Sequence, residues 1–199
     1  AFTGATHLAM DTTAGEKERK SLEPLLINPV PRWQIMTGKM LTTMVFAMAS
    51  LALTLVSFRI VLPYMPVGAF GMDLTLGLET LLKILFVISP VAILAAALLT
   101  LLASFAKSYR EAQSYMGLVI LIPMIPSLIF MANPIKAEMW MMNIPLFSQN
   151  LLIGELIREE AVPLTWYALS IAGTLVIGLA LAVVAATLYN RPKLIFSTS

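Results

Sequence analysis

Four long uncharged stretches dominate the pattern of hydrophobic and polar positions along the chain. They cover residues 40–58, 84–106, 112–135 and 161–190, so each has 19 to 30 residues. A helix needs about 20 apolar residues to cross a bilayer, and a backbone in lipid must satisfy its own hydrogen bonds. The stretches do not alternate with a period of two, so we expect four transmembrane helices.

The predicted fold class is therefore an all-α integral membrane protein. The opening "AFTGATHLAMD" is too short to span a bilayer. We interpret it as the end of an earlier helix, whose beginning would lie in a longer natural protein. The expected segments are the truncated helix at 1–11, a cytoplasmic elbow at 12–39, transmembrane helices at 40–63, 80–106, 112–133 and 165–190, connections at 64–79, 107–111 and 134–164, and a tail at 191–199.

Composition supports the membrane class. The chain is 59% hydrophobic and 12% charged, whereas a soluble domain carries about 25% charged residues. A net charge of +2 gives no argument for nucleic-acid binding. The chain has no cysteine and one histidine, His7, so disulfides and thiolate metal sites are excluded and histidine chemistry has almost no material. We expect no catalytic, cofactor-binding or metal-binding residue in this chain.

Lysine and arginine residues predict the orientation of the helices. If the elbow is cytoplasmic, nine of the 13 basic residues lie on the inner side and four on the outer side. Basic residues favour cytoplasmic loops. We therefore expect the elbow and the C-terminus in the cytoplasm.

Three prolines interrupt the predicted spans. Pro90 lies in the second stretch, and Pro123 and Pro126 lie in the third. Proline removes a backbone donor and kinks a helix. Each is a candidate hinge, with a static bend as the alternative.

The connection at 134–164 contains a predicted amphipathic helix. Apolar residues at helical spacing are set against polar ones, namely Phe147, Leu151, Leu152 and Leu156 against Gln149, Glu155, Arg158 and Glu159. Such a pattern is typical of a helix lying at a membrane surface. The pattern alone fits either a gate at the outer mouth or a connector.

The elbow concentrates charge in a chain that has little. Nine of the 24 charged residues lie between Asp11 and Lys39. Pro24 ends one helix near Leu22 and can start a short second one. Thr13 and Glu16 have the spacing of a capping box, or else lie within one continuing helix. The mixed charges beside exposed leucines indicate either a docking surface for another protein or a solvated loop.

The elbow sequence "DTTAGEKERKSLEPLLINPVPRWQIMTGK" resembles the cytoplasmic signature of permease subunits of type-2 ATP-binding-cassette exporters. Within that family it is most similar to the sodium-efflux NatB-like branch. Three positions depart from the family pattern, namely Lys17, Lys20 and Ser21. The matching positions are Asp11, Thr12, Ala14, Gly15, Glu16, Glu18, Arg19, Leu22, Glu23, Pro24, Leu25, Leu26, Pro29, Arg32, Gly38 and Lys39.

This resemblance implies a coupling helix that docks on a separate cytoplasmic ATPase. ATP and Mg²⁺ would then bind to that partner, and a second permease unit, identical or related, would complete the pathway in the plasma membrane. The chain itself would be no enzyme, and sodium would be a candidate cargo. The implied docking residues are Glu16, Glu18, Arg19, Leu22, Glu23, Pro24, Leu25, Leu26, Pro29 and Arg32.

The residues argue against two rival functions. A stand-alone secondary transporter or channel usually places charged side chains within the bilayer, and the stretches at 84–106, 112–135 and 161–190 contain none. An intramembrane protease is suggested only by the Glu159-Glu160 pair, which no histidine follows. A phosphate-binding loop of the Gly-x-x-x-x-Gly-Lys-Ser/Thr type is also absent from the sequence, so the ATPase must be a separate chain.

Overall fold

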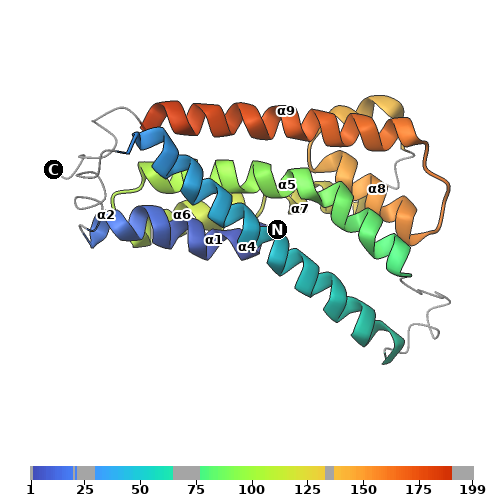
Figure 1. Ribbon diagram of the computed structural model, residues 1–199. Helices are drawn as coiled ribbons and strands as arrows, with labels where there is room; N and C mark the ends of the chain where they lie inside the picture. Colours follow the sequence, from blue (N-terminus) through green and yellow to red (C-terminus); the bar gives the residue numbers. More distant parts are fainter. Residues whose placement is uncertain (1, 20, 22–29, 65–76, 133–136, 190–199) are drawn as a thin grey trace.

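The computed structural model describes residues 2–19, 21, 30–64, 77–132 and 137–189, and every regular element within them is helical (Figure 1). The four segments predicted to span the membrane are long and apolar enough to do so, which confirms an all-α membrane protein. In chain order the elements are α1 (Phe2–Met10), the π-helix η1 (Asp11–Gly15), α2 (Glu16–Glu18), α4 (Arg32–Val61), the 3-10 turn η2 (Leu62–Tyr64), α5 (Leu78–Phe105), α6 (Tyr109–Val119), α7 (Met124–Ala132), the 3-10 helix η4 (Met139–Asn143), α8 (Phe147–Ile157) and α9 (Leu164–Tyr189).

Helix α5 forms the centre of the bundle, and α1, α4 and α9 pack around it (Figure 1). In the most apolar 18-residue stretch of α5, 61% of the residues are buried, compared with 11% to 17% in the corresponding stretches of the other three spans. Its buried face is rich in alanine, at Ala92, Ala95, Ala96, Ala97 and Ala103. Such small side chains let neighbouring helices approach closely within a membrane.

The contact between α5 and α9 depends on a glycine. A Cβ atom placed on Gly178 of α9 would lie 3.2 Å from the backbone nitrogen of Leu94 and 3.3 Å from its Cα. Both neighbours are backbone atoms, which cannot move aside as a flexible side chain can. The absence of a side chain at Gly178 therefore sets how closely these helices pack.

Helix α4 has buried residues only as far as Leu51. Its buried apolar positions follow helical spacing, at Met36, Met40, Ala47 and Leu51. After Leu51 no described residue of α4 is buried, and Figure 1 shows this part diverging from the bundle. The helix also begins at Arg32, eight residues before the predicted start at 40, because charged residues interrupt the apolar run without interrupting the helix.

Pro90 lies within an unbroken α5. A proline has no N–H, so the carbonyl of Phe86, four residues earlier, loses its usual partner. The hydroxyl of Ser89 donates to that carbonyl at 2.8 Å. The helix therefore continues through Pro90 with its backbone satisfied, and a hinge role for Pro90 stays a prediction.

Pro123 and Pro126 accompany a break in the third span. The prediction had one helix at 112–133, but the structure divides this region into α6 and α7. The carbonyls four residues before each proline accept from nearer donors, with Ile122 N bonded to Val119 O at 3.1 Å and Ile125 N to Ile122 O at 3.2 Å. Tighter turns thus replace the α-helical bonds that the prolines remove.

Helix α8 lies in the predicted amphipathic region, at the end of the bundle opposite α2 (Figure 1). Its predicted apolar residues Leu151, Leu152 and Leu156 are buried, together with Ile84 and Val87 of α5. The hydrophobic side of α8 thus faces the protein. Its role as a gate or a connector stays open.

Gln149 was assigned to the polar face of this helix, and that assignment is wrong. Its side chain is buried, and both its amide oxygen and its amide nitrogen form hydrogen bonds. Its Oε1 accepts from the backbone N–H of Leu146 at 2.6 Å, and its Nε2 donates to Ser170 Oγ at 3.0 Å and Thr174 Oγ1 at 2.6 Å. Ser170 in turn donates to Ser148 Oγ at 2.8 Å. These contacts attach α8 to α9.

Candidate functional site

The N-terminal part of the elbow continues the first helix. Met10 and Glu16, at the two ends of η1, both have right-handed helical backbone angles, so α1, η1 and α2 form one helix with a π-helical middle. No side chain caps α2. Thr13 and Glu16 therefore belong to a continuing helix and do not form a capping box. We call residues 11–19 the elbow arm. Wide π turns of this kind often occur at functional sites.

An ion pair joins the elbow arm to α4. The ammonium group of Lys39 donates to Glu16 Oε2 and to the carbonyl oxygen of Thr12. The Lys39 side chain is only 8% exposed, whereas that of Glu16 is 28% exposed. Met36 and Met40 on the same helix are buried too, so water has little access to the lysine charge. Such a charge depends on its partner, because a buried unpaired ammonium is strongly unfavourable.

Two further contacts join the elbow arm to other helices. Lys17 Nζ donates to the carbonyl oxygen of Ser104 at the end of α5. The backbone N–H of Tyr109, at the start of α6, donates to Glu18 Oε2 at 2.7 Å. Burial lowers the pKa of Lys17, and the nearby charge of Lys39 lowers it further, while Glu111 acts in the opposite direction. The elbow arm is therefore fixed to α4, α5 and α6.

The second ion pair of the region is of a different kind. Arg19 pairs with Asp11 along the elbow arm itself, and both side chains are more than half exposed. Exposed pairs contribute little because water screens them. This pair lies along the arm and connects it to no other element.

The structure describes four of the ten predicted docking residues. Glu16, Glu18 and Arg19 lie on the elbow arm, and Arg32 begins α4. Glu16 and Glu18 are bonded to other helices of the same chain, and their role in docking stays a prediction. The other six lie outside the described residues, namely Leu22, Glu23, Pro24, Leu25, Leu26 and Pro29.

In the sequence, Lys39 was identified as a match to the family pattern, and no partner was predicted for it. Its signal was present, because Lys39 is the last charge before an uncharged run and its neighbours Met36 and Met40 mark a buried helix face. A charge on that face needs a partner. Which carboxylate supplies it could not be read from the pattern, since Glu16 is 23 residues away.

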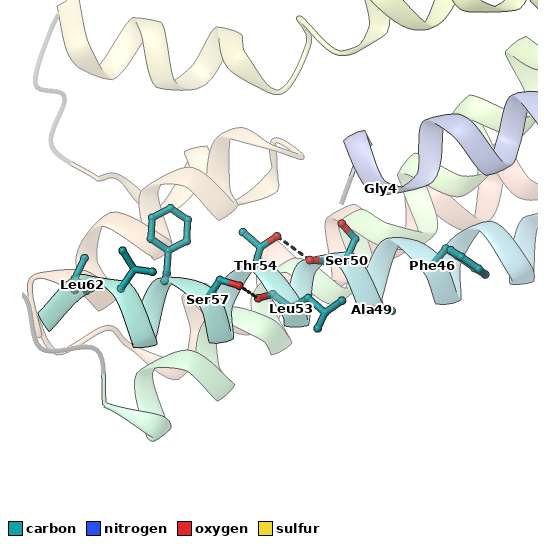
Figure 2. Close-up of a pocket in the computed structure, with 10 residues that line it drawn as sticks. Gly4, Phe46, Ala49, Ser50, Leu53, Thr54, Ser57 and Leu62 are labelled. Atoms are coloured by element: carbon teal, nitrogen blue, oxygen red, sulfur yellow. Dashed lines mark hydrogen bonds between the residues drawn. The ribbon is translucent and has the colours of Figure 1, made fainter. Parts of the chain in front are cut away.

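An apolar hollow of about 670 Å³ lies along the second half of α4 and begins near Gly4. Figure 2 shows the residues that line it. Phe46, Leu53 and Leu62 contribute to its wall. Two of its hydroxyl groups donate to their own helix, Thr54 to Ser50 O and Ser57 to Leu53 O. The hollow is therefore suited to hydrocarbon, such as lipid chains or another apolar helix.

Four further charged residues lie at exposed positions. Glu79 and Lys83 form an ion pair one helical turn apart, at 2.6 Å. Glu159 and Glu160 are exposed in the turn after α8. Within the described part of the chain, no group of three or more acidic, histidine or cysteine residues could hold a metal ion.

Comparisons of the sequence with known proteins show the family of this chain. The family model described as ABC-2 family transporter protein matches residues 1–188, so the chain belongs to that family. The ABC transporter permease protein NatB of Bacillus subtilis (strain 168) is 32% identical over 184 residues, which are 90% of this chain and 47% of that relative. The chain thus spans about half the length of this curated relative. No solved structure matches the chain.

Proposed function

We propose that this chain is part of the membrane permease of an ATP-driven exporter, and that a separate ATP-binding-cassette ATPase docks on its elbow. The observation that carries the proposal is the attachment of the elbow arm to three helices, through Glu16 to α4, Lys17 to α5 and Glu18 to α6. A force applied to the segment after the arm would reach these helices together. Membership of the ABC-2 family supports the same reading.

In this proposal the chain performs no chemistry. ATP and Mg²⁺ bind to the partner ATPase, and energy transfer consists of a difference in docking between nucleotide states. The elbow and C-terminus face the cytoplasm from the plasma membrane, in accord with the distribution of basic residues. A second permease unit, identical or related, completes the pathway.

Sodium is the cargo that the resemblance to the NatB-like branch favours. Sodium prefers oxygen ligands, and hydroxyl groups such as that of Ser89 lie within the spans. We propose to compare radioactive sodium with labelled peptides and lipids in transport assays, using inverted vesicles that contain the full-length permease and its ATPase. ATP-dependent uptake of sodium alone would support a sodium exporter, and uptake of another class would replace that assignment.

Co-purification tests the ATPase partnership. The full-length permease is co-expressed with a candidate cassette ATPase from the same organism, and the permease is captured from detergent. We expect the ATPase to be retained, and we expect Leu25→Asp with Leu26→Asp to abolish its retention because the apolar docking surface is lost. Ser21→Asp is the matched control, since it adds a charge to the same elbow without removing a leucine. Retention by the double variant would contradict the docking role and leave a stand-alone transporter as the alternative.

A further inference from the structure

The covalent connection between the elbow arm and α4 is not a continuous helix. Pro31, which directly precedes α4, has φ −57° and ψ 135°, an extended conformation outside the helical region. No side chain caps this end of α4. A joint of this kind can change direction when the preceding segment is displaced. The chain connection alone therefore does not make α4 follow the elbow.

The ion pair of Glu16 with Lys39 bypasses this joint. Lys39 lies seven residues after Arg32, so the elbow arm is bonded to α4 about two turns beyond the joint. The ammonium group holds both a carboxylate and the Thr12 carbonyl of the elbow arm. Separation of the two elements would leave the lysine charge in a place with little water, which is unfavourable. The arm and the packed part of α4 are thus held to one another.

We propose that Lys39 is a positioning residue for transport, because its ion pair with Glu16 makes α4 move together with the elbow arm when the ATPase displaces the elbow. This inference rests on the proposed function and adds the route by which the displacement enters the membrane. Lys17 and Glu18 hold the arm to the ends of α5 and α6. Lys39 is itself a residue of α4, and its two hydrogen bonds join the elbow arm to this helix. The part of α4 after Leu51 diverges from the bundle (Figure 1).

The movement of α4 can be measured with spin labels, since this chain contains no cysteine of its own. In the full-length permease bound to its ATPase, labels are placed at Ile60→Cys, near the end of α4, and at Thr165→Cys, near the start of α9. Both positions are exposed. Distance distributions are recorded by double electron–electron resonance without nucleotide and with ATP, Mg²⁺ and vanadate.

We expect a nucleotide-dependent shift in the unmodified protein and its loss in Lys39→Met, with the ATPase still co-purifying. Lys83→Met is the matched control, because it removes the lysine of an exposed ion pair and should leave the shift intact. The variant Glu16→Gln keeps the shape of the side chain but removes the counter-charge of Lys39, and it should reduce the shift, which a purely steric role for Lys39 would not explain. It also provides a second folded test if Lys39→Met is poorly produced.

A shift of unchanged size in Lys39→Met would overturn the inference, as would a shift of unchanged size in Glu16→Gln. Absence of any shift in the unmodified complex would also overturn it. Failure of the unmodified permease to bind the ATPase would overturn the proposed function itself. That outcome is recognised in the co-purification step, before any distance is measured.

Discussion

The ammonium group of Lys39, two turns into α4, donates to the carboxylate of Glu16 in the elbow arm, and only 8% of the lysine side chain is exposed. This pair joins the elbow arm to a membrane helix across a non-helical connection. It also fixes which face of the elbow arm turns toward the bundle. The remaining contacts of the arm follow from that orientation, since Glu18 is then placed beside the start of α6.

Glu16→Ala should destabilise the protein by about 3 kcal/mol, because it leaves the ammonium group of Lys39 buried without a counter-charge. The measurement is reversible unfolding in mixed micelles followed by tryptophan fluorescence. Glu79→Ala removes the carboxylate of an exposed pair and should cause no measurable loss. Equal effects of the two substitutions would show that burial of Lys39 has no energetic consequence.

Gln149→Leu should destabilise the protein by about 2 kcal/mol, because the N–H of Leu146 and the hydroxyl groups of Ser170 and Thr174 lose their common partner. The same unfolding measurement applies. Gln113→Leu, at an exposed position of α6, is the control and should not be destabilising. A stable Gln149→Leu variant would indicate that these groups find other partners.

Ser89 and Pro90 should be energetically coupled. Ser89→Ala deprives the Phe86 carbonyl of its donor and should cost about 1 kcal/mol. In a Pro90→Ala background the new N–H of residue 90 can bond to Phe86, so Ser89→Ala should be close to neutral there. A double-mutant cycle by thermal unfolding measures this difference. Additive effects would contradict the assigned role of the serine hydroxyl.

Gly178→Ala should destabilise the contact of α5 with α9 by about 1 to 2 kcal/mol, since the new methyl group meets the backbone of Leu94. Gly117→Ala is the matched substitution, because a Cβ there meets no atom within 4 Å. It should stabilise α6 by about 0.5 to 1 kcal/mol through the higher helix propensity of alanine. Melting temperatures of the two variants should therefore shift in opposite directions, and a common direction would contradict this account of the packing.

The membrane helices could be predicted from the sequence because lipid imposes long uncharged runs. The predicted range 80–106 corresponds to α5 at Leu78–Phe105, and 165–190 corresponds to α9 at Leu164–Tyr189. The start of α4 was missed because a helix that extends into water keeps its backbone bonds while its composition changes. The break between α6 and α7 was signalled by its two prolines, but the pattern did not determine whether they would kink the helix or end it.

The candidate site was predictable as a segment and not as a set of contacts. The charge cluster and the leucines identified the elbow, whereas the pairing of Glu16 with Lys39 depends on how two helices are placed in space. Gln149 was assigned to water because it is polar, although its spacing to Leu152 and Leu156 places it on their buried face. Its burial is stabilised by two hydroxyl groups of α9, and these partners cannot be read from the sequence of α8.

Site-specific crosslinking tests the docking of the ATPase on the elbow most directly. A single cysteine is introduced as Leu26→Cys in the full-length permease, the complex with the ATPase is treated with a short photoactivated thiol crosslinker, and the products are identified by mass spectrometry. Tyr64→Cys, an exposed position at the other end of α4, is the control. If the ATPase docks on the elbow, we expect an ATPase adduct from Leu26→Cys and none from Tyr64→Cys. An ATPase adduct from Tyr64→Cys alone, or from neither position in a complex that co-purifies, would contradict it.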